Sequence, residues 1–89
     1  MTEVQTFDEA VTRVRDLTQK PNDDELLELY GLFKQATEGD NTTDRPGIMN
    51  LKGRYKWDAW TARKGLSNEE AKNEYVAKVK HLMTKYEHS

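Results

Sequence analysis

Hydrophobic side chains recur every three or four residues along most of this chain, which is the spacing of amphipathic helices. Four stretches carry the pattern, and they predict helices over about residues 7–20, 22–38, 51–64 and 67–86. The apolar face of the second stretch is wider than one neighbouring helix would need. No segment alternates with the period of two that is typical of a strand, so the sequence predicts an all-α protein.

Capping signals mark the ends of these helices. At three helix starts an Asn, Ser or Thr stands three residues before a Glu, which is the spacing of a capping box. The pairs are Thr6 with Glu9, Asn22 with Glu25, and Ser67 with Glu70. Asn50 can cap the third helix, Pro21 ends the first, and Gly39 and Gly65 supply stops for the second and third.

The connection from residue 39 to residue 50 is rich in turn-forming residues and longer than most helix-to-helix loops. A loop of this length can cross over the bundle, so the second and third helices need not be antiparallel. The 89 residues are expected to form one domain, residues 1–89. With 35% hydrophobic residues and no cysteine, helix packing has to stabilise that domain without a disulfide.

The net charge of −2 hides an uneven distribution. Residues 1–44 carry four basic and eleven acidic side chains, whereas residues 45–64 carry six basic and one acidic. A cationic centre in an acidic protein indicates a local anion site rather than a face for long nucleic acid, which usually goes with a basic domain. The lack of cysteine also excludes thiol catalysis and zinc ribbons, and it fits a reducing compartment.

Little in the sequence points to catalysis, a metal or a membrane. His81 and His88 belong to no recognisable nucleophile, acid–base or metal pattern, and no glycine-rich phosphate loop is present. The first residues do not resemble a secretory signal, and no apolar run is long enough to span a bilayer. We therefore expect a cytoplasmic protein that is not an enzyme, holds no metal and does not insert stably into membranes.

Aromatic and basic side chains alternate at helical spacing in the second and third helices. Such groups can neutralise a phosphate and stack on a purine, which are the two requirements of a nucleotide site. The candidates are Tyr30, Phe33 and Lys34 on the second helix, Lys52 and Lys56 on the third, and Tyr75 on the fourth. In the alternative interpretation the rings only pack and the lysines are solvated.

Two further groups of apolar side chains are expected to pack rather than to bind a ligand. Trp57 and Trp60 are three residues apart on the third helix, and such a pair is more often part of the core than a stacking platform. Ile48, Met49 and Met83 are expected to fill gaps or to anchor a loop.

Several motifs resemble, in order and spacing, those of one known family. They are Tyr30-Gly31-Leu32-Phe33-Lys34-Gln35-Ala36-Thr37, then Gly39-Asp40, Asn41-Thr42, Arg45-Pro46-Gly47 and Lys56-Trp57-Asp58-Ala59-Trp60. From about Phe7 to Tyr86 the sequence is similar to the acyl-CoA-binding protein family, also called diazepam-binding inhibitor or endozepine. The resemblance implies a four-helix bundle of up-down-down-up topology that binds medium- to long-chain fatty acyl-CoA esters without catalysis.

The resemblance also implies roles for individual residues, carried over position by position. Tyr30, Lys34 and Lys56 would hold the 3′-phosphate and ribose of coenzyme A, and Phe33 and Tyr75 would contact its adenine. The rest of the polar part of the ligand would meet Arg15, Lys20 and Lys52. The acyl chain would lie in a groove lined by Val11, Leu26, Leu27, Leu51 and Tyr55.

Three positions depart from the family pattern. Phe33 keeps a stacking face but lacks the hydroxyl of the tyrosine that many members have. Arg15 replaces a common lysine, which conserves the charge but not the geometry. Tyr55 stands where a small residue is frequent, beside the implied path of the acyl chain, and so bears on the preferred chain length.

The sequence thus favours a monomeric intracellular carrier that buffers and delivers acyl-CoA. Such a carrier needs no cofactor, and we expect transient contacts with acyl-CoA-using enzymes and membrane surfaces. One alternative is a helical protein-interaction module or receptor peptide ligand, which needs no small-molecule pocket. Another is a single-stranded nucleic-acid binder that uses residues 45–64, and an enzyme is the least favoured alternative.

Overall fold

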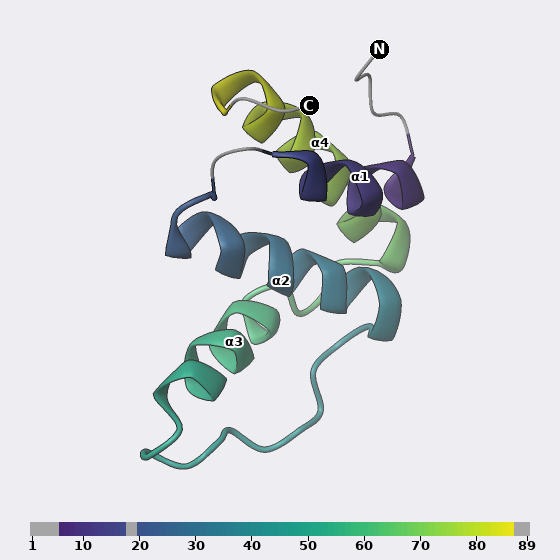
Figure 1. The fold of residues 1–89 in the computed structure, drawn as a ribbon. Helices are drawn as coiled ribbons and strands as arrows, with labels where there is room; N and C mark the ends of the chain where they lie inside the picture. The colour runs from purple at the N-terminus through teal and green to yellow at the C-terminus, as the bar shows by residue number, and fades with distance from the viewer. Residues whose placement is uncertain (1–5, 18–19, 87–89) are drawn as a thin grey trace.

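The computed structural model describes residues 6–17 and 20–86, and over these residues the chain forms four α-helices and one short 3-10 helix (Figure 1). The elements are α1 (Phe7–Arg13), the 3-10 helix η1 (Val14–Asp16), α2 (Asp23–Glu38), α3 (Leu51–Thr61) and α4 (Asn68–Lys85). The described part of the chain contains no β-strand, which confirms the all-α class.

The predicted helix caps form. In each capping box the cap side chain accepts the glutamate N–H, and the glutamate carboxylate accepts the cap N–H. These boxes begin α1 at Thr6, α2 at Asn22 and α4 at Ser67. Asn50 caps α3 by accepting the N–H of Gly53. Gly39 follows α2 with φ of 82°, and Gly65 follows α3 with φ of 98°, in the left-handed region that favours glycine.

Two helices end earlier than their hydrophobic pattern predicts. α1 stops at Arg13, and the next turn tightens into η1 before the backbone becomes extended at Leu17. A tighter last turn gives partners to carbonyls that have none further along the helix. Residues 18–19 of the predicted helix lie outside the described residues, and the predicted end at residue 20 is wrong because the backbone is already extended at Leu17. α3 stops at Thr61 rather than at residue 64, because the next residues already bond carbonyls three positions back.

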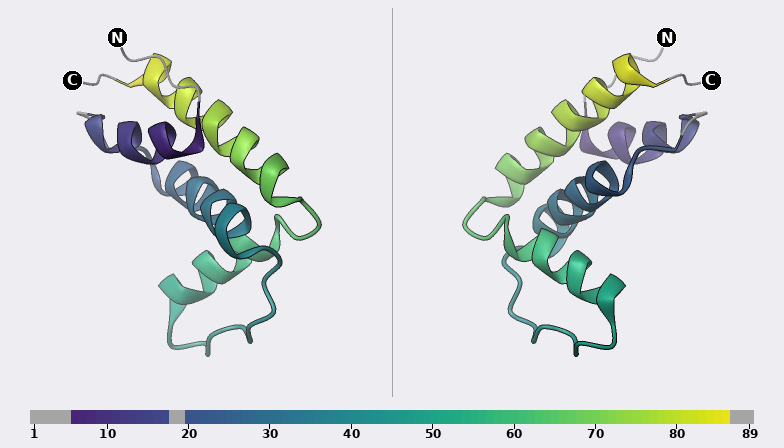
Figure 2. Two further views of the ribbon diagram at one scale, coloured as in Figure 1. Left: turned by 90° about the vertical axis from the view of Figure 1, so that its right-hand side faces the viewer. Right: turned by 90° about the vertical axis from the view of Figure 1, so that its left-hand side faces the viewer.

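α2 is the central helix of the bundle. It packs against α4 and α3, while α1 packs against α4 (Figure 2). In Figure 1, α2 and α3 run from left to right and α1 and α4 run back, so the topology is up-down-down-up as the resemblance implies. The long loop after α2 returns along the molecule, and this crossover lets α2 and α3 point in the same direction.

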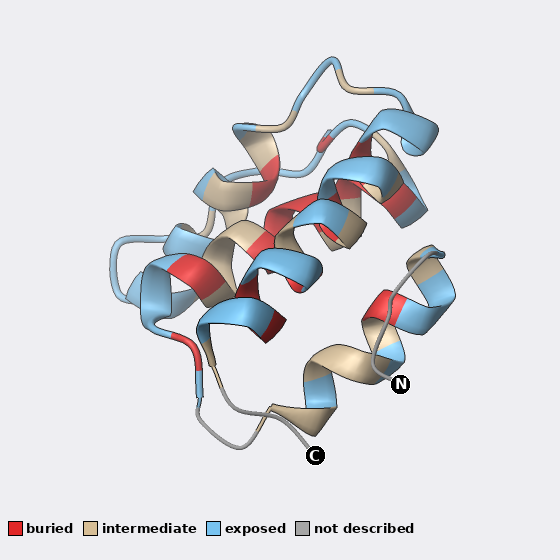
Figure 3. Cartoon of the chain, turned by 90° about the horizontal axis from the view of Figure 1, so that it is seen from above, coloured by how far each residue is buried: buried red, intermediate tan, exposed pale blue. Residues whose placement is uncertain are grey.

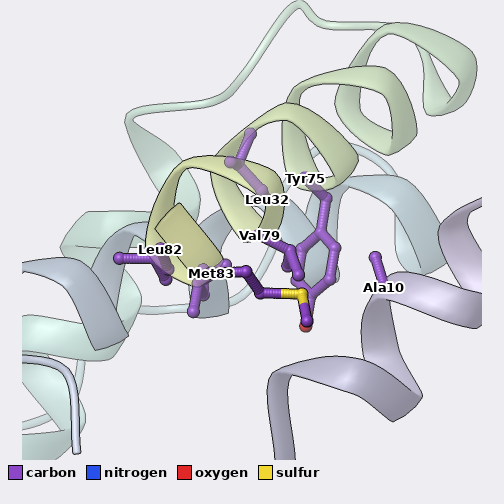
Figure 4. Packing of buried hydrophobic residues seen from close by; sticks show 7 residues of the cluster. Ala10, Leu32, Tyr75, Val79, Leu82 and Met83 are labelled. Carbon is purple, nitrogen blue, oxygen red and sulfur yellow. The ribbon is translucent and has the colours of Figure 1, made fainter. Parts of the chain in front are cut away.

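The core lies between α2 and α4, and α1 closes one side of it (Figure 3; Figure 4). Its buried side chains are Ala10, Leu29, Leu32, Tyr75, Val79, Leu82 and Met83. Trp60 is the one described residue of α3 that is buried, so α3 adds little to the core. Trp57, which was also expected in the core, is only half-buried.

Polar contacts hold the start of the crossover loop. The buried Gln35 donates from Nε2 to Asp40 Oδ1 (2.8 Å) and to a carbonyl of the α3–α4 link (2.9 Å). Asp40 Oδ1 also accepts the N–H of Gly65 at 3.0 Å, and this bond, followed by the one from Gln35, lowers the pKa of Asp40. Trp60 Nε1 donates to the Gly39 carbonyl at 2.8 Å, which joins α3 to the end of α2.

The middle of the crossover loop is also held by polar bonds, not by its apolar residues. Asn41 Nδ2 donates to a threonine hydroxyl at the end of α3 (3.0 Å), and Trp57 Nε1 donates to the Thr43 carbonyl (3.0 Å). The expectation that Ile48 and Met49 anchor the loop or fill gaps is wrong, because 73% and 94% of their surfaces are exposed. The turn that contains them lies beyond these anchors, away from the core.

α2 and α3 are in close backbone contact at Gly31. A Cβ placed there would lie 2.3 Å from the carbonyl oxygen of Ala59 and 2.8 Å from its carbon. Glycine is therefore required for the two backbones to meet at this point. Because α3 has no other close helical neighbour in the described part of the chain, this contact decides where α3 lies.

Replacing Gly31 with alanine should push α3 away from α2. Alanine favours a helix over glycine by about 0.5–1 kcal/mol, but the clash should outweigh this gain and lower the free energy of unfolding by roughly 1–3 kcal/mol. Urea denaturation followed by circular dichroism measures the change. Gly47→Ala is the matched control, because nothing lies within 4 Å of a Cβ there. Equal stability of Gly31→Ala and the wild type would refute the close contact.

A charge cluster ties the end of α4 to the start of α2. The buried carboxylate of Glu25 accepts bonds from Lys85 Nζ (2.8 Å) and the Tyr86 hydroxyl (2.6 Å), besides the Asn22 N–H (3.0 Å). The bond from Lys85, followed by that from Tyr86, lowers the pKa of Glu25 from 4.5 to about 2. The fold therefore favours the ionised carboxylate.

Glu25 should make the protein less stable in acid. A carboxyl group with a depressed pKa stabilises the fold above its unfolded pKa, here 4.5, and loses that contribution as the pH falls through about 2. Glu25→Gln should lower the melting temperature at neutral pH, and its difference from the wild type should close as the pH approaches 2. Glu74→Gln, which removes an exposed carboxylate of α4, controls for the lost charge. A difference that stays constant with pH would contradict this assignment.

Candidate functional site

A groove of about 660 Å³, here called the main groove, lies between the N-terminal halves of α2 and α3. Figure 1 shows the two helices diverging towards these ends from their close contact. Lysines, aliphatic side chains and tyrosines share its lining, which also includes one carboxylate. The lining residues are Lys20, Asp23, Leu26, Leu27, Tyr30, Leu51, Lys52, Tyr55 and Lys56.

Helical spacing explains why these residues share the main groove. On α2 the lining residues from 23 to 30 lie at i, i+3, i+4 and i+7, which is one face of a helix. On α3 they form two pairs one turn apart, positions 51 and 55, and positions 52 and 56. The first turn of α3, which contains Lys52, holds no acidic residue.

Tyr30 and Lys56 meet across the main groove. Lys56 Nζ lies 5.2 Å from the centre of the Tyr30 ring, in a cation–π contact. Lys34 is not among the described residues that line the groove. Its Nζ lies 4.8 Å from the centre of the Trp60 ring and forms an ion pair with Glu38. Tyr30 and Lys34 are one turn apart on α2, and Lys56 and Trp60 are one turn apart on α3. Both ammonium groups therefore lie along the interface between α2 and α3, here called the seam.

A smaller groove of about 290 Å³, the side groove, adjoins the main groove and shares Leu26 and Tyr30 with it. Its other lining residues are Val14, Pro21, Leu29, Phe33 and Tyr75. The two rings expected to contact an adenine therefore face the same hollow, although they come from α2 and α4. Their centres are 6.3 Å apart.

The ring of Tyr75 belongs partly to the core. It is 5% exposed, and its centre lies 5.1 Å from that of Phe7 in an edge-on contact. Burial raises the pKa of the Tyr75 hydroxyl, against the opposing charge of Arg15, so the hydroxyl is neutral at physiological pH. The Tyr75 ring therefore packs in the core as well as lining the side groove, whereas the side chains of Tyr30 and Phe33 are half-buried.

Some of the other residues expected to contact the ligand line a groove, and others do not. Lys20 and Lys52 line the main groove, together with three of the aliphatic candidates. Arg15 is exposed and lines neither described groove, although its charge acts on Tyr75, which lines the side groove. Val11 packs from α1 against the core and lines neither groove.

Several lining residues were missed by reasoning from the sequence. Asp23 has the helical spacing of Leu26 and Tyr30, a signal that could have found it, but its place in the first turn pointed to capping instead. Val14 and Pro21 lie in η1 and in the link to α2. No local pattern predicts the path of that link.

Lysines and aliphatic walls in one hollow suit an amphipathic anion, a phosphorylated head with an apolar tail. Among the described residues no group of His, Cys, Asp and Glu is placed to hold a metal ion, and His88 lies outside those residues. None of the helices in residues 6–17 and 20–86 has the length and apolarity needed to cross a bilayer.

Known proteins are similar to this chain over most of its length. Residues 4–79 match the family described as "Acyl CoA binding protein". The chain is 56% identical to acyl-CoA-binding protein 2 of Saccharomyces pastorianus over 82 residues, which is 92% of this chain and 94% of that protein. It is 53% identical to acyl-CoA-binding protein homolog 1 of Caenorhabditis elegans, over 91% of this chain and 94% of the relative.

Solved structures share the fold. The crystal structure of Oryza sativa acyl-CoA-binding protein 2 matches with a TM-score of 0.85 at 51% identity, over 89% of this chain and 88% of that one. The solution structure of acyl coenzyme A binding protein from yeast matches with a TM-score of 0.70 at 55% identity, over 90% and 93%. Sequence and fold agree, and the chain belongs to the acyl-CoA-binding protein family.

Proposed function

We propose that this protein binds medium- to long-chain fatty acyl-CoA esters in the main and side grooves and that it buffers and transports them inside the cell. The observation that carries the proposal is the presence of cations, aromatic rings and aliphatic walls in two adjoining hollows. Relatives whose names state acyl-CoA binding support it. The chain would act as one domain, residues 1–89, and as a monomer.

The seam of α2 and α3 suits the 3′-phosphate of coenzyme A. Tyr30 and Lys56 already contact each other, and Lys34 lies along the same seam. A phosphate placed there would meet two ammonium groups, with Lys34 exchanging the Glu38 carboxylate for the ligand. Hydrogen bonds between ionised partners are about twice as strong as neutral ones.

The side groove suits the adenine. Phe33 and Tyr75 would contact the base through their ring faces and edges, and the neutral hydroxyl of Tyr75 would not repel the nearby phosphates. The remaining polar part of the ligand would meet Lys20 and Lys52 in the main groove, and Arg15, whose charge acts on Tyr75.

The aliphatic walls suit the acyl chain. Leu26, Leu27 and Leu51 line the main groove with Tyr55, while Val11 would be reached only by a chain that extends towards α1. Each methylene that leaves water contributes about 0.8 kcal/mol. Affinity should therefore rise about fourfold per methylene until the groove is full, less the cost of ordering the chain.

The proposed activity is binding without turnover. Among its lining residues the main groove offers lysines, tyrosines and Asp23 as titratable groups, and it pairs no serine, threonine or cysteine with a base. A thioester held there would be sheltered from bulk water rather than attacked.

Removing Lys56 should weaken only ligands that carry the 3′-phosphate. Lys56→Ala should bind a long-chain acyl-CoA about tenfold or more weakly, since hydrogen bonds to charged groups contribute about 1.5–3 kcal/mol. The same variant should bind the 3′-dephospho ligand as the wild type does. Titration calorimetry gives both affinities, and Lys80→Ala, at an exposed position of α4, is the control.

Two results would count against these assignments. Equal affinities of the wild type for acyl-CoA and its 3′-dephospho analogue would remove the phosphate site. If saturating long-chain acyl-CoA did not raise the melting temperature of the wild type, the whole proposal would fail and a helical interaction module would be favoured.

Tyr55 should influence which acyl chains bind best. Its ring lines the main groove, although 57% of its surface is exposed. Tyr55→Ala should widen the path of the chain and move the affinity maximum towards longer chains in a calorimetric series of saturated acyl-CoAs. Tyr55→Phe keeps the ring and should leave the maximum in place. An identical series for Tyr55→Ala and the wild type would show that the ring does not touch the chain.

A further inference from the structure

Four large apolar side chains are exposed in the short segment from residue 48 to residue 55. The exposed fractions are 73% for Ile48, 94% for Met49 and 57% for both Leu51 and Tyr55. Single exposed apolar residues are normal, but four within eight residues of the chain indicate an interaction site. The main groove accounts for Leu51 and Tyr55, which line it, and leaves Ile48 and Met49 unexplained. We call these four residues the apolar strip.

Ile48 and Met49 lie at the tip of a tight turn. The Asn50 N–H donates to the Gly47 carbonyl at 2.9 Å, so Ile48 and Met49 take the two central positions. Arg45, just before the turn, binds a carboxylate of α3 through bonds of 3.1 and 2.8 Å. The tip is therefore fixed to α3, and the loop that carries it projects at the opposite end of the molecule from the end of α4 (Figure 2).

Charge distinguishes this end of the molecule. Residues 45–64 carry six basic side chains and one acidic, and Lys52 and Lys56 are exposed beside the apolar strip. Residues 1–44 carry eleven acidic side chains and four basic. An anionic surface would attract residues 45–64 and repel residues 1–44. It would therefore orient the molecule so that the turn at Ile48 and Met49 faces the surface.

We propose that the apolar strip and the neighbouring lysines of α3 form a docking surface for anionic phospholipid membranes. Ile48 and Met49 enter the interfacial layer, while Lys52 and Lys56 remain at the level of the headgroups. A fluid bilayer yields around a convex tip, whereas a protein partner needs a complementary concavity and roughly 800 Å² of contact. Attachment through so few side chains is weak and reversible.

Docking would bring the mouth of the main groove to the membrane. Leu51 and Tyr55 belong both to the apolar strip and to the groove lining, so docking would place part of the groove lining next to the bilayer. This consequence rests on the proposed function, because it concerns the exchange of an acyl chain. The docking itself needs no bound ligand, and it is therefore tested on the empty protein.

Vesicle sedimentation with the unliganded protein tests the docking surface. Phosphatidylcholine vesicles with about 30 mol % phosphatidylserine should bind the protein more tightly than pure phosphatidylcholine vesicles, and salt should weaken the binding. The double variant Ile48→Asn, Met49→Asn should bind the anionic vesicles about tenfold more weakly, because two apolar side chains no longer leave water.

Two lysine variants separate local docking from net charge. Lys52→Gln, in the first turn of α3, should weaken vesicle binding about fivefold, whereas Lys80→Gln on α4 should have less than about a twofold effect. Titration of acyl-CoA without vesicles should give the double variant wild-type affinity. That result would show that the variant is folded and that the groove is intact.

The proposal would be overturned by the absence of vesicle binding, by equal binding to neutral and anionic vesicles, or by a double variant that binds as the wild type does. A wild-type dimer in analytical ultracentrifugation that the double variant lacks, without vesicle binding, would assign the apolar strip to a second copy of the chain. If the wild type bound anionic vesicles but did not bind acyl-CoA, the proposed function would be rejected and the docking surface would be supported.

Discussion

The seam between α2 and α3 is the contact on which the rest of this structure depends. α3 has α2 as its one close helical neighbour among the described residues, and Gly31 lets the backbone of α2 reach the carbonyl of Ala59. From this contact the helices diverge, and the main groove is the space between them. One glycine and the polar bonds of Gln35 and Trp60 therefore determine the shape of the groove.

α2 connects the stability of the fold to its proposed function. Leu29 and Leu32 on one side of the helix are buried in the core, whereas Leu26, Leu27 and Tyr30 line the main groove. Part of the wide apolar face predicted from the sequence is thus buried in the core, and the rest lines the main groove. Apolar surface in contact with water is unfavourable, and a ligand with an apolar tail removes it from water. A ligand would cover the part of α2 that is not buried in the core.

The two lysines of the seam differ in what a phosphate would have to displace. The ring of Tyr30 attracts the ammonium group of Lys56 without neutralising it, so its charge remains available to an anion. Lys34 lies over Trp60 but is also paired with Glu38, and a phosphate would compete with that carboxylate. The family resemblance implies the same role for both lysines. Their neighbours differ, because only Lys34 of the two is paired with a carboxylate of the described residues.

The sequence by itself determined the helices, their caps and the wide apolar face of α2, because these depend on residues within four positions of each other. The capping box of Asn22 and the stop at Gly65 are of this local kind. Resemblance, rather than periodicity, supplied Lys20 and Arg15 as site residues. Only the tertiary structure decided that α1 ends early, that Lys34 turns to Trp60 and that Met49 is exposed. The place of Lys34 depends on how α2 packs against α3, and the exposure of Met49 depends on where the crossover loop is held, and local spacing encodes neither.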